Sequence, residues 1–215
     1  MAARISSLFL VCVWLSLTGA SPAMATDGGD ASPAPVILIL GDSLSAAYGI
    51  DQRDGWVQLL EQRLRQRGLP QRVFNASVSG ETSSGGLRRI GPLLRRHRPD
   101  IVVIELGAND GLRGLPVSAM RANLERIIEA SRQAGARVLL VGMRLPPNYG
   151  FRYTKQFEDS YRQLARQHDI GLVPFLLEGV GADLANMQAD GLHPIAEVQP
   201  RLLENVWEYL RPMLE

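Results

Sequence analysis

The sequence predicts a single α/β domain built on a five-stranded parallel sheet with helices on both faces. Short runs of apolar and β-branched residues alternate along the chain with segments in which apolar residues recur every three or four positions. Neither an internal repeat nor a change of composition marks a second domain. Strands that alternate with helices form parallel sheets covered on both faces, with right-handed crossovers.

The five expected strands are runs typical of strands buried on both faces: residues 36–40, 73–77, 101–106, 137–143 and 171–175. The simplest order for such strands is 2-1-3-4-5, the three-layer, flavodoxin-like arrangement. This order places the first strand between the second and the third.

The segments between and after the strands carry apolar residues on one helical face. Gly135, just after one of these segments, is expected to end its helix. The apolar faces comprise Trp56, Leu59, Leu60 and Leu64; Met120, Leu124, Ile127 and Ile128; Phe157, Tyr161, Leu164 and Ala165; and Leu203, Val206, Trp207 and Leu210.

Residues 1–25 have the pattern of a secretory signal peptide. Arg4 precedes an apolar run over residues 8–17, and Ala23-Met24-Ala25 provides a small-residue cleavage site. An uncleaved anchor is the alternative, but the run is shorter than the ~20 residues of a spanning helix. We therefore expect a periplasmic or secreted protein without a stable membrane insertion after cleavage. Residues 26–35 would be a flexible lead-in, and residues 36–215 the domain.

The composition of the remaining chain limits its partners. The single cysteine, Cys12, lies in the segment to be removed, so no disulfide is expected. Without Arg4 the chain has 22 basic and 22 acidic residues, which favours neither a nucleic-acid partner nor a basic membrane surface. No spacing of His, Cys or Asp indicates a metal site, so no metal or cofactor is expected. We expect a monomer that acts on a small molecule.

Four clusters of small polar residues follow the expected strands. They are "GDSLS" at 41–45, "SVSGETSSGG" at 77–86, "GANDG" at 107–111 and "DGLHP" at 190–194. Ligands of open parallel sheets bind beyond the carboxyl ends of the strands. We therefore expect the four clusters to meet at one edge, where their polar groups could form a site.

Ser43 is the candidate nucleophile, although a turn or a phosphate cradle would also explain "GDS". A serine hydroxyl needs a base, and His193 is the one histidine with a carboxylate, Asp190, three residues before it. Asp190 could fix the tautomer of that ring and stabilise its charge. By itself "DGLHP" is also a common turn before a helix. The other histidines, His97 and His168, have the spacing of residues at a helix end and on a helix face.

Acyl transfer also requires hydrogen-bond donors where negative charge develops on the carbonyl oxygen. Ser43 and Gly80 could offer backbone N–H groups, and Asn109 its side-chain amide. The structural alternatives are that Gly80 serves a turn and that Asn109 forms an Asx turn or a helix cap.

These four clusters, in this order, resemble the four sequence blocks of the SGNH (GDSL) hydrolases. Together with "VIELGANDGLRG" and "RLPPNYGFRYTKQFEDSY", the resemblance covers almost all of the chain after residue 25 and is strongest to the branch of periplasmic multifunctional esterases. It implies that Ser43, His193 and Asp190 are nucleophile, base and orienting carboxylate, and that Ser43, Gly80 and Asn109 form the oxyanion hole. Substrates would be aryl esters, acyl-CoA and lysophospholipids.

Two further expectations concern the substrate. The loops 144–153 and 175–187 would flank the site and set acyl preference, with Pro146, Asn148 and Tyr149 as substrate-binding residues. Relatives commonly have Gly where this chain has Ala108, whose methyl group could narrow the site.

Three other functions compete with ester hydrolysis. A nucleotide-binding module is disfavoured because no P-loop Lys-Ser/Thr pair and no G-x-G-x-x-G motif follows the first strand. A carbohydrate O-deacetylase could use the same triad, and a non-catalytic exported binding protein is the remaining alternative. The α/β-hydrolase elbow G-x-S-x-G is absent around Ser43.

Overall fold

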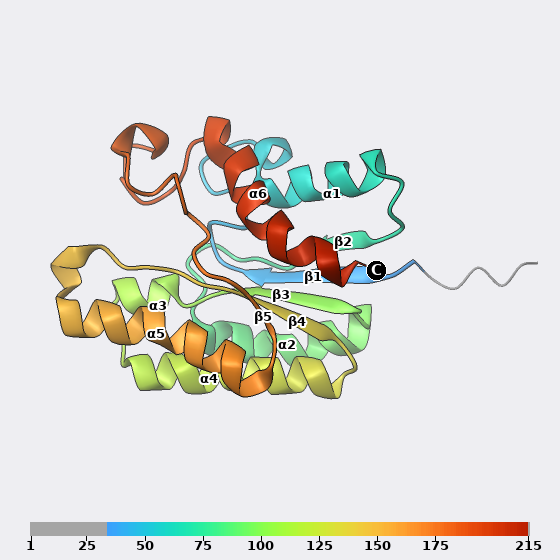
Figure 1. Cartoon of the computed structure of the whole chain (residues 1–215), viewed down its shortest axis with the longest axis horizontal. Coiled ribbons are helices and arrows are strands. Elements are labelled where there is room, and N and C mark those ends of the chain that lie inside the picture. Colours follow the sequence, from blue (N-terminus) through green and yellow to red (C-terminus); the bar gives the residue numbers. More distant parts are fainter. Residues whose placement is uncertain (1–33, 215) are drawn as a thin grey trace, which may run out of the picture. The chain divides into compact units, whose positions relative to one another are not determined.

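Five parallel strands form one sheet in the order β2-β1-β3-β4-β5, which confirms the predicted topology (Figure 1). The computed structural model describes residues 34–214, so the expected signal peptide lies outside the described residues. The strands are β1 (Val36–Gly41), β2 (Arg72–Asn75), β3 (Ile101–Glu105), β4 (Arg137–Val141) and β5 (Gly171–Val173).

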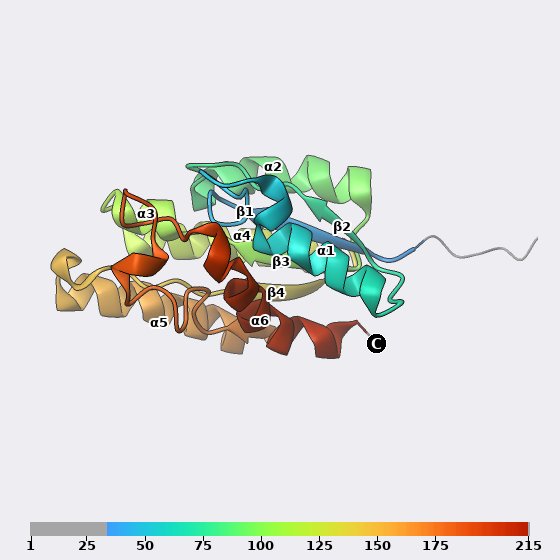
Figure 2. The ribbon, with the colours of Figure 1, turned by 90° about the horizontal axis from the view of Figure 1, so that it is seen from above.

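Helices cover both faces of the sheet, as Figures 1 and 2 show. On one face lie α1 (Trp56–Gln66) and α6 (Gln199–Leu210); on the other lie α2 (Ser83–His97), α4 (Val117–Gln133) and α5 (Phe151–His168). The short α3 (Ala108–Leu112) follows β3. Single 3₁₀ turns occupy Gln52–Asp54, Pro147–Tyr149, Leu184–Asn186, Ala196–Val198 and Arg211–Met213. None of the helices within residues 34–214 has both the length and the apolarity needed to cross a bilayer.

The expectation that all five strands are buried on both faces is wrong for the two edge strands. β1, β3 and β4 are almost entirely buried, whereas three of the four residues of β2 are exposed, including Phe74. An edge strand has only one hydrogen-bonded neighbour in the sheet. β2 and β5 end at Asn75 and Val173, before the ends of the expected runs. Beyond β2, the Ala76 and Val78 N–H groups still donate to the carbonyls of Ile39 and Gly41, at 2.9 and 3.1 Å.

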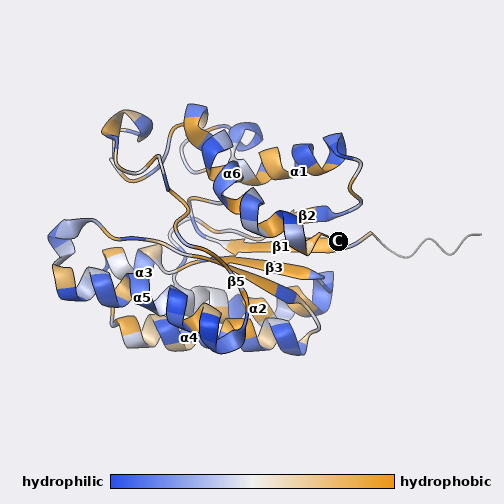
Figure 3. Cartoon of the chain, viewed as in Figure 1, coloured by the Kyte–Doolittle hydropathy of each residue, from blue (hydrophilic) through white to orange (hydrophobic). Residues whose placement is uncertain are grey.

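The predicted helical faces pack against this sheet, and the hydropathy of the ribbons follows the same division (Figure 3). Gly135 lies just beyond α4 with φ +86° and donates its N–H to the Arg132 carbonyl at 3.0 Å. Residues 83–86, at the end of the second polar cluster, form the first turn of α2. Thr82 caps this helix by accepting from the Gly85 N–H at 3.3 Å, and a Cβ at Gly86 would lie only 2.4 Å from Leu106 Cδ1. Glycine at this position thus allows the start of α2 to pack closely against Leu106, the residue that follows β3.

Candidate active site

Ser43 follows β1 in a tight turn at the carboxyl edge of the sheet. The Ala46 N–H donates to the Asp42 carbonyl at 3.0 Å, and the Tyr48 N–H to the Ser43 carbonyl at 3.2 Å. Gly41 begins the turn, and a Cβ there would lie 2.8 Å from the side chains of Ser45 and Ser77. The chain therefore needs glycine at this position to turn sharply and direct Ser43 out of the sheet.

The imidazole of His193 lies between Ser43 and Asp190. Its Nε2 is 2.8 Å from Ser43 Oγ, and its Nδ1 is 2.6 Å from Asp190 Oδ2. The other carboxylate oxygen, Oδ1, accepts the backbone N–H groups of Leu192 at 2.9 Å and of His193 at 3.0 Å. The structure thus brings together three side chains that lie up to 150 residues apart in sequence.

Asp190 is held in its ionised form. The hydrogen bond from the His193 ring, followed by those from the two backbone N–H groups, lowers the pKa of Asp190 to about 2. At neutral pH this carboxylate is therefore an acceptor, and Nδ1 of His193 is the donor. The opposite nitrogen, Nε2, is then free to accept the Ser43 hydroxyl proton.

Two residues that sequence reasoning missed hold the His193 loop in place. The Tyr48 ring lies against the His193 ring, with centroids 4.6 Å apart. Gln188 Nε2 donates to the carbonyls of Tyr48 at 2.8 Å and Pro194 at 3.1 Å, while the Gln188 N–H donates to the His193 carbonyl at 2.7 Å. The only signal in the sequence is an aromatic residue five positions after the nucleophile candidate, and it does not identify Gln188.

Ser43, Gly80 and Asn109, the residues expected to donate hydrogen bonds to an oxyanion, line one cavity. Within residues 34–214 neither the Ser43 N–H nor the Gly80 N–H donates to another protein group. Gly80 has φ +76°, and its carbonyl accepts from Arg113 Nη2 at 2.9 Å. Asn109 lies in the first turn of α3, not in the third strand, and its Nδ2 donates to Asp42 Oδ2 at 3.0 Å.

A cavity of about 680 Å³ opens beside Ser43, Gly80, Asn109 and His193. Ala108 is also one of its lining residues. Most of the remaining wall is apolar, as in the side chains of Leu112, Met143, Leu145, Phe175, Leu177 and Leu184. Both expected flanking loops contribute to this wall, which could accommodate an acyl chain.

Of the three expected substrate-binding residues, only Pro146 lines this cavity. Asn148 and Tyr149 lie outside its wall, because the 3₁₀ turn at Pro147–Tyr149 leads the chain away toward α5. The Tyr149 hydroxyl donates to the Leu112 carbonyl at 2.9 Å. This hydrogen bond connects Tyr149 to the C-terminal end of α3.

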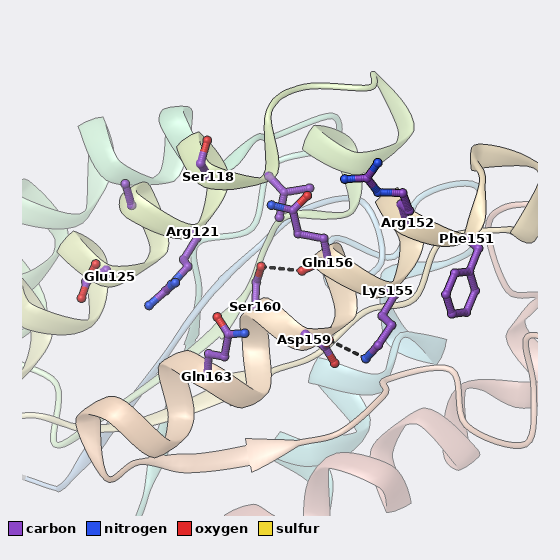
Figure 4. Close-up of a pocket in the computed structure, with 12 residues that line it drawn as sticks. Ser118, Arg121, Glu125, Phe151, Arg152, Lys155, Gln156, Asp159, Ser160 and Gln163 are labelled. Atoms are coloured by element: carbon purple, nitrogen blue, oxygen red, sulfur yellow. Dashed lines mark hydrogen bonds and ion pairs between the residues drawn. The ribbon is translucent and has the colours of Figure 1, made fainter.

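A second cavity, of about 810 Å³, lies between α4 and α5 (Figure 4). Its charged groups include the pair Lys155–Asp159, joined at 2.7 Å, and the Ser160 hydroxyl donates to the Gln156 carbonyl at 2.8 Å. No histidine is among its lining residues. Its Lys155 and Asp159 are paired with each other and its Ser160 hydroxyl bonds to a backbone carbonyl, so no serine–base pair like that of Ser43 and His193 is formed there.

The two other histidines have structural contacts. His97, the last residue of α2, stacks on Phe74 with ring centroids 3.6 Å apart. His168 Nε2 lies 3.3 Å from Glu125 Oε1. Together with Glu129 these residues form a group in which the atoms that could bind a metal ion all lie within 4.8 Å of one another. Sequence spacing could not reveal this group, because its members come from two helices.

The chain is similar in sequence to known esterases and thioesterases. The sequence model of the GDSL-like Lipase/Acylhydrolase family matches residues 39–199. The chain is 52% identical to Esterase TesA of Pseudomonas aeruginosa over 181 residues, which cover 84% of this chain and 90% of that protein. It is 40% identical to Thioesterase 1/protease 1/lysophospholipase L1 of Escherichia coli K12 over 184 residues, covering 86% and 87% of the two chains.

Among solved structures, the psychrotrophic esterase EstA from Pseudoalteromonas, inhibited by monoethylphosphonate, superimposes with a TM-score of 0.80 at 42% identity. The similarity covers 83% of this chain and 98% of EstA. The chain therefore belongs to the GDSL-like lipase/acylhydrolase family.

Proposed function

We propose that this enzyme hydrolyses esters and thioesters through an acyl-enzyme on Ser43, with His193 as general base and acid and Asp190 as the orienting carboxylate. The chain is a carboxylic ester hydrolase or thioesterase, like relatives named esterase, arylesterase and thioesterase. One observation carries the assignment of roles: the His193 ring lies within hydrogen-bond distance of both Ser43 and Asp190.

In the proposed cycle Ser43 Oγ attacks the carbonyl carbon as His193 Nε2 takes its proton. The carbonyl oxygen becomes an oxyanion, and His193 then protonates the leaving alcohol or thiol as the bond to it breaks. Water repeats the sequence on the acyl-enzyme and releases the acid. Asp190 stays ionised throughout and stabilises the imidazolium, because its pKa of about 2 lies far below neutral pH.

The oxyanion would be bound by the Ser43 N–H, the Gly80 N–H and the Asn109 side-chain amide. Since no group of residues 34–214 accepts the two backbone N–H groups, they need no rearrangement to receive the oxyanion. The similar esterase EstA is inhibited by monoethylphosphonate, and phosphorus in a phosphonate is tetrahedral, like the carbon of this intermediate.

The apolar wall of the cavity favours a substrate with an acyl chain. A carbohydrate ester would leave this wall without apolar contacts, so we place glycan deacetylation second. We further propose that residues 1–25 direct export and are removed, and that the mature chain acts as a monomer in the periplasm or outside the cell.

The proposal is tested with purified residues 26–215 on p-nitrophenyl esters, acyl-CoA and lysophospholipid, combined with labelling by a fluorophosphonate. We expect the wild type to hydrolyse at least the ester panel and to be labelled, and Ser43→Ala to lose both properties. Ser84→Ala, at an exposed position on α2, is the matched control and should behave as wild type. Hydrolysis by Ser43→Ala at the wild-type rate would overturn the assignment of the nucleophile.

A further inference from the structure

The buried carboxyl groups of Asp42 and Glu105 have no part in the cycle described above. We propose that they share one proton, carried by Glu105, and that this pair holds the Asn109 amide in the orientation that serves the oxyanion. The inference rests on the proposed function, because it concerns how one donor of the oxyanion hole is kept in place. Glu105 and Asp42 would be positioning residues, since neither is proposed to touch the substrate.

The side chains of Asp42, next to Ser43, and of Glu105, at the end of β3, are both fully buried. Within residues 34–214, no lysine, arginine or histidine forms a salt bridge with either of them. Two adjacent carboxylates without a counter-ion are unstable in a medium of low polarity, so one of them binds a proton instead.

The hydrogen bonds indicate which group is protonated. Asp42 accepts on both oxygens, from the Leu44 N–H at 3.1 Å and from Asn109 Nδ2 at 3.0 Å. Glu105 accepts only on Oε2, from the Ser45 hydroxyl at 2.7 Å and the Asp42 N–H at 3.3 Å, and no donor reaches its buried Oε1. An oxygen with no incoming donor is the one that can carry a proton.

The electrostatic environment leads to the same assignment. Burial raises the pKa of Asp42 to about 6, and its hydrogen bonds with Leu44, Asn109 and Glu105 oppose this rise. Burial, and then the charge of Asp42, raise the pKa of Glu105 well above its ordinary value. Both shifts therefore favour one shared proton, which the free Oε1 oxygen of Glu105 is placed to carry while Asp42 stays ionised.

The remaining ionisable groups nearby do not supply another donor to Glu105. The buried Tyr161 hydroxyl donates to the Leu106 carbonyl at 3.0 Å. Asp110 already accepts the Ser83 N–H at 2.8 Å and the Ser83 hydroxyl at 2.6 Å. His193, whose charge lowers the pKa of Asp42, lies against Ser43 instead.

An ionised Asp42 determines which end of the Asn109 amide faces it. A carboxylate can only accept, so the amide must present its NH₂ group to Asp42 and not its oxygen. One N–H bonds to Asp42 Oδ2, and the second remains for the oxyanion. With a neutral amide at position 42 the Asn109 group could turn over, and the oxyanion would then face the Asn109 oxygen.

The test is a double-mutant cycle of Asp42→Asn with Asn109→Ala, followed through kcat and KM for p-nitrophenyl butyrate. Loss of one oxyanion donor lowers kcat by ~10²–10³, so we expect Asn109→Ala to do so and Asp42→Asn to lower kcat by about 10²-fold with KM nearly unchanged. In the Asn109→Ala background, Asp42→Asn should cost less than about threefold, because the donor that it positions is already missing.

Variants at Glu105 test where the proton resides. Glu105→Gln can donate to Asp42 and accept from Ser45 as the protonated acid does, so we expect kcat within about threefold of wild type, whereas Glu105→Leu should lose about 10²-fold. Melting temperatures show whether each variant is folded. If Glu105→Leu does not fold, the isosteric Glu105→Gln variant still tests the proposal.

Additive losses in the cycle, or a Glu105→Gln variant as impaired as Glu105→Leu, would overturn this inference. If either outcome were found and Ser43→Ala were inactive, the assignment of Ser43 as nucleophile would still hold. Hydrolysis by Ser43→Ala would instead contradict the proposed function itself.

Discussion

The ring of Tyr48 lies against the ring of His193, with centroids 4.6 Å apart and ring planes inclined by 41°. Tyr48 follows Ser43 closely in sequence, so the segment that carries the nucleophile candidate also supports its base. Aromatic pairs of this kind contribute about 0.5–1.5 kcal/mol beyond the area that they bury. We therefore expect Tyr48→Ala to lower kcat by about 3- to 10-fold, measured with a p-nitrophenyl ester.

The matched control is Tyr48→Phe. The Tyr48 hydroxyl has no hydrogen bond to another side chain within residues 34–214, so removing it leaves the contact between the rings intact. Activity of this variant should stay within about twofold of wild type. If both variants lost activity equally, the hydroxyl and not the ring would be the important group.

Gly49 and Gly68 form a second matched pair, since both have positive φ, +74° and +65°. A Cβ at Gly49 would lie 2.0 Å from Gln188 Oε1, whereas a Cβ at Gly68 would meet nothing within 4 Å. Alanine at either position should destabilise the protein by ~1–2 kcal/mol because of its left-handed backbone. Only Gly49→Ala also displaces Gln188 from the Tyr48 carbonyl, so only this variant should lower kcat, by about 3- to 10-fold.

Urea unfolding and kinetics of the two glycine variants provide the measurement. Comparable losses of kcat would mean that Gln188 does not hold the His193 loop, and unchanged stability in both would contradict the strain argument.

The raised pKa of Glu105 makes stability depend on pH. Burial and the Asp42 charge raise the pKa of Glu105 in the folded protein, whereas in the unfolded chain a glutamate has a pKa of ~4.3. This contribution to stability is therefore complete below pH ~4.3 and is lost as pH rises toward the folded value, by about 1.4 kcal/mol for each pH unit. Glu105→Gln has no proton to lose, so its stability relative to wild type should increase between pH 5 and 8.

Urea unfolding at pH 5, 6.5 and 8 would measure this difference. Glu208→Gln, at an exposed position on α6, controls for the removal of one carboxylate. A difference between Glu105→Gln and wild type that is constant over this range would mean that Glu105 is ionised in the folded protein.

The alternation of short apolar runs and amphipathic segments predicts a parallel sheet, and the observed strand order is the simplest one for such strands. The sequence also offers Ser43 and the Asp190–His193 pair as candidates, since each lies in a short polar cluster after a strand. Exposure of β2 could not be predicted, because Phe74 in an apolar run does not reveal that its strand lies at an edge.

The network behind Ser43 could not be predicted either. Glu105 is a single polar residue in an apolar run, and its partners Asp42 and Ser45 both lie in the turn after the neighbouring strand β1. Gln188 donates a hydrogen bond to the carbonyl of Tyr48, which lies 140 residues earlier in the sequence. Contacts of this kind depend on tertiary packing, which leaves no periodic signal in the sequence.

Leu184 provides the test of the acyl cavity, because it lines the wall and is nevertheless 78% exposed. A long acyl chain would cover this side chain, and each buried CH₂ group contributes ~0.8 kcal/mol. We expect Leu184→Ser to lower kcat/KM for a p-nitrophenyl decanoate by about 3- to 10-fold, and to change it for the acetate by less than about twofold, since an acetyl group has little apolar surface to place against this wall. Leu115→Ser, at an exposed leucine outside the wall, should leave the ratio of decanoate to acetate activity as in the wild type. An unchanged ratio in Leu184→Ser would mean that the acyl chain takes another path, because the loss of apolar contact scales with the length of chain that passes this residue.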